Sequence, residues 1–392
     1  MRNFIRRCPE AVLILICIGS FCATGFGQVP VPQVPPSCVS ANNANPIRLL
    51  VLGDSIMWGQ GLKETNKASY LVQDWLCRST NRAVFIKREA HSGAIIVGDN
   101  SDSGFKDGEI NLDGPTISEQ VDAALLEYER ESIHPSWVDL VLVDGCINDV
   151  SADVIINART DILELRKAAK ATCGERMKDL LGKITNTFPN ARVLVTGYYP
   201  VISEKTQRNL IIRLVQRFLI RDFSEALKTK ERYLRLQSVS LSREWKAASD
   251  ENLESSVEYV NEKLKAAGKP PNIRFVKVNF GPDDSFNAPE TSLWNLKTSE
   301  FSRHNFWGRL KYILAFRFIS DLKPNDEQLE SRANSCKVAF KDSKTLRVRC
   351  KFASLGHPNK AGAQKYATAI ESALRPLFES ISGWLQTAAS RR

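Results

Sequence analysis

The sequence predicts an α/β fold, a three-layer α/β/α sandwich with a mostly parallel central sheet, on three observations. Short apolar runs alternate along the chain with segments whose apolar residues have helical spacing. The runs carry few polar residues, as expected for strands buried on both faces of a parallel sheet. With 392 residues, 43% of them hydrophobic, the chain can bury a sizeable core. Together these features favour a parallel sheet with helices on both faces.

The first predicted strand is the most distinctive segment. Residues 47–52 form an almost unbroken apolar run that ends in Gly53-Asp54-Ser55. Catalytic and binding groups of open α/β sheets lie just past the carboxyl ends of strands, where Ser55 would be placed. A Ser in this position also commonly caps the helix that follows. The segment alone does not decide between nucleophile and cap.

The other elements are predicted in chain order. Strands are expected at 83–86, 137–143, 192–197 and 273–280, and helices at 68–79, from 117, between 162 and 188, at 307–322 and from 360. Residues 100–114 are rich in Asp, Gly, Asn and Ser, which indicates a surface loop. The interval 203–270 is largely helical and too long for a simple crossover. It predicts a helical insertion, either a packed subdomain or a mobile lid.

The two ends of the chain are expected to lie outside the fold. Residues 1–27 have the layout of a secretory signal peptide, with three Arg before an apolar run at 11–23. That run of about 13 residues is too short for a comfortable membrane span. A secreted, periplasmic or extracellular location follows, with a lipoprotein anchor at Cys22 and an uncleaved anchor as alternatives. Residues 28–46 hold five Pro and are expected to form an extended lead-in, residues 47–380 one domain, and residues 381–392 a tail.

The net charge of +10 falls to +8 when residues 1–27, with three Arg and one Glu, are removed. The charges are dispersed and accompany no nucleic-acid motif, so solvated helix faces explain them and no nucleic-acid partner is expected. No second stretch is apolar enough to span a membrane.

Three of the nine Cys precede residue 28, which leaves an even number and suggests disulfides in an exported protein. Cys336 and Cys350 flank a polar, basic, hairpin-like segment and are predicted to pair. The remaining four, Cys38, Cys77, Cys146 and Cys173, allow three connectivities. Their spacing fits no zinc pattern, so neither a metal nor another cofactor is expected.

A Ser nucleophile needs a base, and the chain offers four His. His134 lies beside a Pro and is interpreted as a surface residue, while His91 and His304 lie in irregular segments. His357 differs, because Pro358-Asn359 places it in the loop before the last helix. In a doubly wound sheet that loop can return to the first strand, so His357 is the preferred base.

Two common serine-hydrolase patterns are absent, since Met57 excludes G-x-S-x-G and Trp58 excludes S-x-x-K. Instead, Gly53-Asp54-Ser55 is followed by Gly93 and by Gly145-x-x-Asn148-Asp149, each after a predicted strand. His357 comes last, before the final helix. This order resembles the SGNH (GDSL) hydrolase family, whose fold is flavodoxin-like, over residues 47 to about 378.

The resemblance implies a role for each matching position. Ser55 would be the nucleophile, and His357 the base that later protonates the leaving alcohol. The backbone N–H groups of Ser55 and Gly93 and the side-chain amide of Asn148 would form the oxyanion hole. A Gly lets backbone approach the substrate closely, and an Asn amide is a donor that does not titrate. Asp54 is interpreted as a loop or cap residue.

One position departs from the family pattern. The family usually has Asp three residues before the catalytic His, and here that residue is Ser354. A hydroxyl can orient the imidazole but supplies no negative charge. A Ser–His dyad, a carboxylate recruited from elsewhere and a weakened or dead site all stay open.

The resemblance thus implies a serine ester hydrolase, an esterase or lipase acting on a small-molecule, lipid or acylated-glycan ester without a cofactor. A carbohydrate O-acetylesterase or acetyl transferase at the cell envelope is the alternative enzyme. A non-catalytic exported binding protein on the same fold is the alternative from another class.

Overall fold

The computed structural model describes residues 33–98, 115–207, 231–296 and 323–379. The chain divides into two units, Met1–Gln33 and Val34–Arg392, and the fold below is that of the second unit. In the part of the chain that is described, no helix is both long and apolar enough to cross a membrane.

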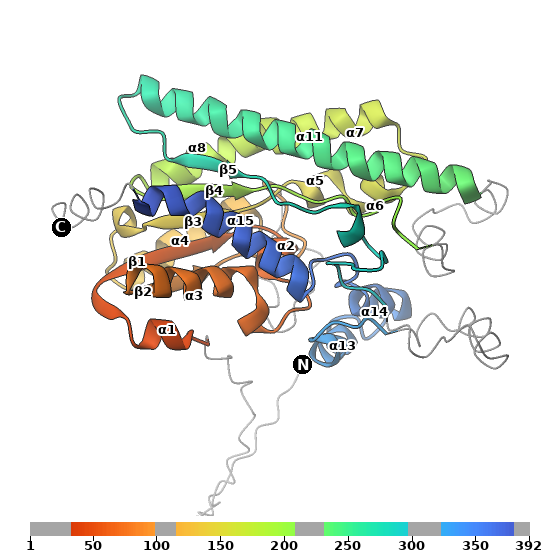
Figure 1. Cartoon of the computed structure of the whole chain (residues 1–392), viewed down its shortest axis with the longest axis horizontal. Helices are drawn as coiled ribbons and strands as arrows, with labels where there is room; N and C mark the ends of the chain where they lie inside the picture. The colour runs from red at the N-terminus through yellow and green to blue at the C-terminus, as the bar shows by residue number, and fades with distance from the viewer. Residues whose placement is uncertain (1–32, 99–114, 208–230, 297–322, 380–392) are drawn as a thin grey trace, which may run out of the picture. The chain divides into compact units, whose positions relative to one another are not determined.

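A sheet of five parallel strands forms the centre of the fold, in the order β2-β1-β3-β4-β5 (Figure 1). The strands are β1 (Asn42–Leu52), β2 (Arg82–Arg88), β3 (Leu140–Val143), β4 (Arg192–Thr196) and β5 (Ile273–Val276). In register, Leu49 of β1 lies between Ile86 of β2 and Leu140 of β3. The chain passes from β1 to β2 on one side and then to β3 on the other, so the strand order reverses between β1 and β3. Such a reversal is where open α/β sheets bind ligands.

Helices cover both faces of the sheet, because alternate residues of the buried strands point to opposite faces. Leu49 and Val51 pack with α3 (Ala68–Thr80) and α15 (Lys360–Glu379). Leu50 and Leu52 belong to the core on the other face. That layer contains α4 (Ile117–Arg130), α7 (Ile162–Ala169), α8 (Met177–Thr187) and α11 (Glu231–Ala266). The predicted three-layer α/β/α architecture is confirmed.

Shorter helices complete the described part. They are α1 (Pro36–Val39), α2 (Ser55–Trp58), α5 (Ile147–Val150), α6 (Ala152–Ile156), α13 (Leu329–Ala339) and α14 (Lys344–Lys351), with a π-helical segment at Lys170–Arg176. Two predicted strands are shorter than expected, since a 3₁₀ turn at Pro135–Trp137 precedes β3 and β5 ends at Val276.

The lead-in expected at 28–46 is wrong for its second half. Residues 36–39 form α1, with Pro at the first helical turn, where its missing N–H costs nothing. Strand β1 begins at Asn42, five residues earlier than predicted. Cys38 is buried and forms a disulfide with Cys77 of α3. The prolines suggested an extended segment without a core, but this segment is joined to the domain by a disulfide.

The described part of the interval 203–270 is mainly α11, a helix of 36 residues. Its Leu241, Trp245 and Leu253 are fully buried in the core on one face of the sheet. This portion is a packed layer of the sandwich. Residues 208–230 of this interval, the loop predicted at 100–114 and the helix predicted at 307–322 lie outside the described residues.

The predicted disulfide Cys336–Cys350 is present, and the structure pairs the remaining four as Cys38–Cys77 and Cys146–Cys173. The segment between Cys336 and Cys350 is a hairpin of two helices, α13 and α14, rather than of strands. Lys and Arg are good helix formers, so its basic composition suits helices.

Candidate active site

The turn after β1 fixes the orientation of Ser55. Asp54 caps α2, and its Oδ1 accepts a hydrogen bond from the N–H of Ile56 at 2.9 Å, as the cap interpretation predicted. Gly53 has φ +136°, and a Cβ there would lie 1.9 Å from Asp144 Oδ1. Only glycine fits this position. Ser55 thus becomes the first residue of a four-residue helix, 6% exposed, at the carboxyl edge of the sheet.

His357 meets Ser55 across the fold. Its Nε2 lies 2.7 Å from Ser55 Oγ, although 302 positions separate the two residues. The turn that carries His357 is held by backbone bonds, since its N–H donates to Ser354 and its carbonyl accepts from Trp294 at 2.7 Å. The sequence-predicted nucleophile and base are therefore within hydrogen-bond distance. The geometry lets the imidazole accept the proton of the Ser hydroxyl.

The predicted oxyanion donors lie on neighbouring loops of the same edge. Gly93 has φ +77° in the loop after β2, and Asn148 lies in α5, just after β3. The Asn148 amide donates one hydrogen bond, to the carbonyl of Ala94 at 3.0 Å. This bond places the amide beside the Gly93 loop. An amide carries two N–H donors, so a second remains for a ligand.

Two buried carboxyls, those of Asp54 and Asp144, support the nucleophile turn, and the sequence analysis assigned no role to Asp144. Asp144, at the end of β3, accepts hydrogen bonds from the N–H groups of Asp54 at 2.7 Å and Met57 at 3.1 Å. Burial raises the pKa of Asp54 to about 6, and burial together with the Asp54 charge raises that of Asp144 well above its usual range. Burial and the proximity of the two carboxyls therefore disfavour two negative charges on this pair.

Tyr198, after β4, connects this turn with the Asn148 helix. Its hydroxyl donates to Asp54 Oδ2 at 2.8 Å and accepts from the N–H of Ile147 at 3.3 Å. One side chain thus fixes the relative position of the turns that carry the candidate nucleophile and the candidate oxyanion donor. No sequence pattern pointed to Tyr198, because its role depends on three elements that meet only in the fold.

Ser354 occupies the place where the family has Asp, but its hydroxyl does not hold the imidazole. It donates to Asp326 Oδ2 at 2.8 Å and accepts from Arg332 Nη2 at 3.0 Å. Among the described residues, the buried Nδ1 of His357 has no hydrogen-bond partner. Ser354 instead positions the base through its backbone carbonyl, 3.0 Å from the N–H of His357.

Asp326 and Arg332 form an ion pair behind Ser354 that the sequence analysis missed. Both side chains are fully buried, and Arg332 Nη1 lies 2.7 Å from Asp326 Oδ1. Asp326 is therefore the candidate for a carboxylate that replaces the family Asp, but the Arg332 guanidinium neutralises its charge.

Burial is the main cause that lowers the pKa of His357 to about 4. The nearby Arg332 charge acts in the same direction, while the Ser354 backbone and Asp326 act in the opposite direction. The imidazole is therefore neutral, and able to act as a base, well below neutral pH. Among the described residues, no three His, Cys, Asp or Glu side chains gather as ligands for a metal ion.

No model of a known protein family matches the chain, and no curated protein does. Solved structures match at low identity. An extracellular lipase from Streptomyces rimosus is 15% identical, over 63% of this chain and 87% of its own, with a TM-score of 0.37. A phospholipase A1 from Streptomyces albidoflavus is 13% identical, over 64% and 88%, with a TM-score of 0.34. A carbohydrate acetylesterase from Sinorhizobium meliloti is 14% identical, over 62% and 87%, with a TM-score of 0.31.

These solved structures are described as ester-hydrolysing enzymes, the class that the sequence resemblance implies. At such identities and TM-scores, the activity of this chain has to be argued from the site itself.

Proposed function

We propose that the chain is a serine ester hydrolase that works through an acyl-enzyme on Ser55. The observation that carries the proposal is the 2.7 Å contact between Ser55 Oγ and His357 Nε2 at the strand-order reversal, between residues 302 positions apart. A nucleophile and its base within hydrogen-bond reach are the signature of covalent catalysis.

The geometry supports the following sequence of steps. Ser55 Oγ attacks the ester carbonyl carbon while His357 Nε2 takes the hydroxyl proton. The carbonyl oxygen becomes an oxyanion, stabilised by the backbone N–H groups of Ser55 and Gly93 and by the Asn148 amide. His357 then gives the proton to the leaving alcohol, and the C–O bond to that alcohol breaks. Water, deprotonated by His357, releases the acid and restores Ser55.

Of the alternatives left open at Ser354, the contacts favour a Ser–His dyad. The carboxylate nearest to that position, Asp326, is paired with Arg332. Within the described ranges, no carboxylate bonds to Nδ1 of His357, so we expect a slower enzyme than one with a complete triad.

Hydrolysis of p-nitrophenyl acetate and labelling with a fluorophosphonate test the proposal. Turnover is expected, together with one equivalent of label on the peptide that contains Ser55. A chain-length series of p-nitrophenyl esters beside acetylated xylan then separates a lipid-type esterase from a carbohydrate O-acetylesterase, and an added acceptor alcohol detects acetyl transfer. No turnover together with no label would favour the exported binding protein instead.

The low pKa of His357 predicts an unusual pH profile. Because the ring is protonated only below a pKa of about 4, kcat/KM is expected to rise with pH around 4 rather than around 6.5. Activity at pH 5 should therefore be close to that at pH 7. A stopped assay with an aryl acetate from pH 3.5 to 8, corrected for unfolding by circular dichroism, measures this limb. A midpoint between 6 and 7 would show that the ring is better stabilised as a cation than its surroundings indicate.

We also propose export, as the predicted signal peptide implies. The three disulfides support it, because disulfides persist in oxidising compartments.

A further inference from the structure

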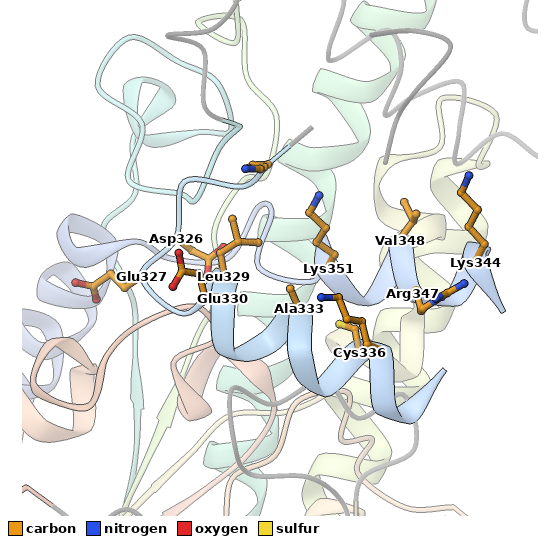
Figure 2. A pocket seen from close by; sticks show the side chains of 12 residues that line it. Asp326, Glu327, Leu329, Glu330, Ala333, Cys336, Lys344, Arg347, Val348 and Lys351 are labelled. Atoms are coloured by element: carbon orange, nitrogen blue, oxygen red, sulfur yellow. The ribbon is translucent and has the colours of Figure 1, made fainter. Parts of the chain in front are cut away.

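The helical hairpin of α13 and α14 encloses a cavity that the proposed reaction does not use. The cavity has a volume of about 630 Å³, and Figure 2 shows its lining residues on both helices. The Cys336–Cys350 disulfide joins the two helices at this place. The walls are therefore held together before any ligand arrives, which reduces the entropy that binding costs.

Among the charged side chains of the lining, cations predominate. Five Lys and Arg side chains contribute to it, against three acidic side chains. Two of the three acids are already engaged, Asp326 with Arg332 and Glu327 with Lys360 at 2.8 Å. Of the cations, four make no ion pair within the described residues: Lys323, Lys337, Lys344 and Arg347. The charged side chains of the cavity therefore sum to a net positive charge, with Glu330 as the one lining acid that is not engaged in an ion pair given above.

Helix α14 concentrates this charge on one side. Lys344, Arg347 and Lys351 recur at intervals of three and four residues and all line the cavity, along about 10 Å of helix. Figure 2 shows the three along this helix. Like charges at such spacings destabilise a helix, and α14 contains no acidic residue to offset them. A bound anion would remove this repulsion.

The cavity adjoins the candidate active site. Glu327, on its wall, donates its N–H to the carbonyl of Gly61, in the loop that follows the Ser55 helix. Asp326, also on the wall, accepts from the hydroxyl of Ser354, whose carbonyl holds the N–H of His357. A molecule in the cavity would therefore contact Asp326 and Glu327, which are hydrogen-bonded to the segments that carry the candidate base and the candidate nucleophile.

We infer that the cavity binds a soluble polyanionic chain, one that bears carboxylate, sulfate or phosphate groups at intervals. If the proposed function holds, on which this second step rests, that chain is the non-reacting part of the ester substrate. A row of cations along a concave wall suits an extended charged chain, whereas a flat membrane surface would touch protruding cations rather than the walls of a cavity.

Titration calorimetry with polygalacturonate at low salt tests the inference, and dextran serves as the uncharged control. The double variant Lys344→Gln/Arg347→Gln is expected to bind polygalacturonate about tenfold more weakly, since two charge contacts are lost. The matched control is Lys341→Gln/Arg349→Gln, which removes the same charge from two exposed side chains outside the cavity lining. It is expected to bind like the unmodified chain.

Three results would overturn the inference: no binding of polygalacturonate, equal loss in both double variants, or stronger binding to phosphatidylglycerol vesicles than to the soluble polymer. The catalytic step is tested separately. With acetylated polygalacturonate, Lys344→Gln/Arg347→Gln should raise KM about tenfold, while the kinetics with p-nitrophenyl acetate stay unchanged. If the chain hydrolyses no ester at all, the proposed function fails and the calorimetry still decides whether the cavity binds polyanions.

Discussion

Replacing Ser55 by Ala is expected to reduce ester hydrolysis by about 10⁴-fold or more, with the fold retained. The variant loses the atom that forms the acyl-enzyme, and water replaces it as a poor nucleophile. His357→Ala should lose a similar amount, because Ser55 is then left without a base. The double variant should be little worse than either single one, since nucleophile and base act as a unit. Initial rates with p-nitrophenyl acetate measure the loss, and thermal unfolding confirms the fold.

The chain supplies its own control. His134 Nδ1 lies 2.6 Å from Ser136 Oγ, another Ser–His contact at hydrogen-bond distance. These residues are two positions apart, and His134 is exposed. Ser136→Ala and His134→Ala should leave the activity unchanged. If Ser55→Ala keeps more than about 1% of the rate, or if the surface pair matters as much, the nucleophile has been misassigned.

The fold class and part of the candidate site could be predicted from the sequence. Ser55 was singled out because it follows an apolar run, and ligand-binding groups of parallel sheets lie at the carboxyl ends of such strands. Gly93 and Asn148 were assigned through the resemblance to the SGNH family, whose motifs follow successive strands in the same order. His357 was found because its loop precedes the last helix. The fold class follows from the same runs, since their alternation with helices leaves few arrangements of a parallel sheet.

The supporting residues could not be found in this way. Asp144 directly precedes a glycine that was noticed, yet its role is to accept N–H groups from a turn some 90 positions earlier. Asp326 and Arg332 lie in a segment without a clear pattern, and nothing in the sequence brings them to Ser354. The prediction of an extended lead-in at 28–46 was wrong in its second half for a related reason. The disulfide that joins it to α3 is one of three connectivities that the remaining four cysteines leave open.

The ion pair behind the base gives the largest expected effect on stability. Arg332→Met is expected to lower the free energy of unfolding by about 3–5 kcal/mol, because it leaves the Asp326 carboxylate buried without its counter-charge. Neither side chain of the pair has measurable exposure, so solvent cannot compensate. The Ser354 hydroxyl would also lose its donor, Arg332 Nη2. Urea unfolding followed by tryptophan fluorescence measures the change.

Two further variants separate the loss of the pair from the loss of a long side chain. Arg332→Met/Asp326→Leu removes both charges and should recover most of the stability, since apolar residues can replace a buried ion pair at little cost. Lys265→Met breaks the surface pair with Glu262, whose side chains are 53% and 70% exposed, and should cost less than about 1 kcal/mol. Equal effects of Arg332→Met and Lys265→Met would contradict the buried pair. If the double variant also keeps its esterase rate, the Asp326 charge contributes nothing to His357, and the dyad acts without a carboxylate.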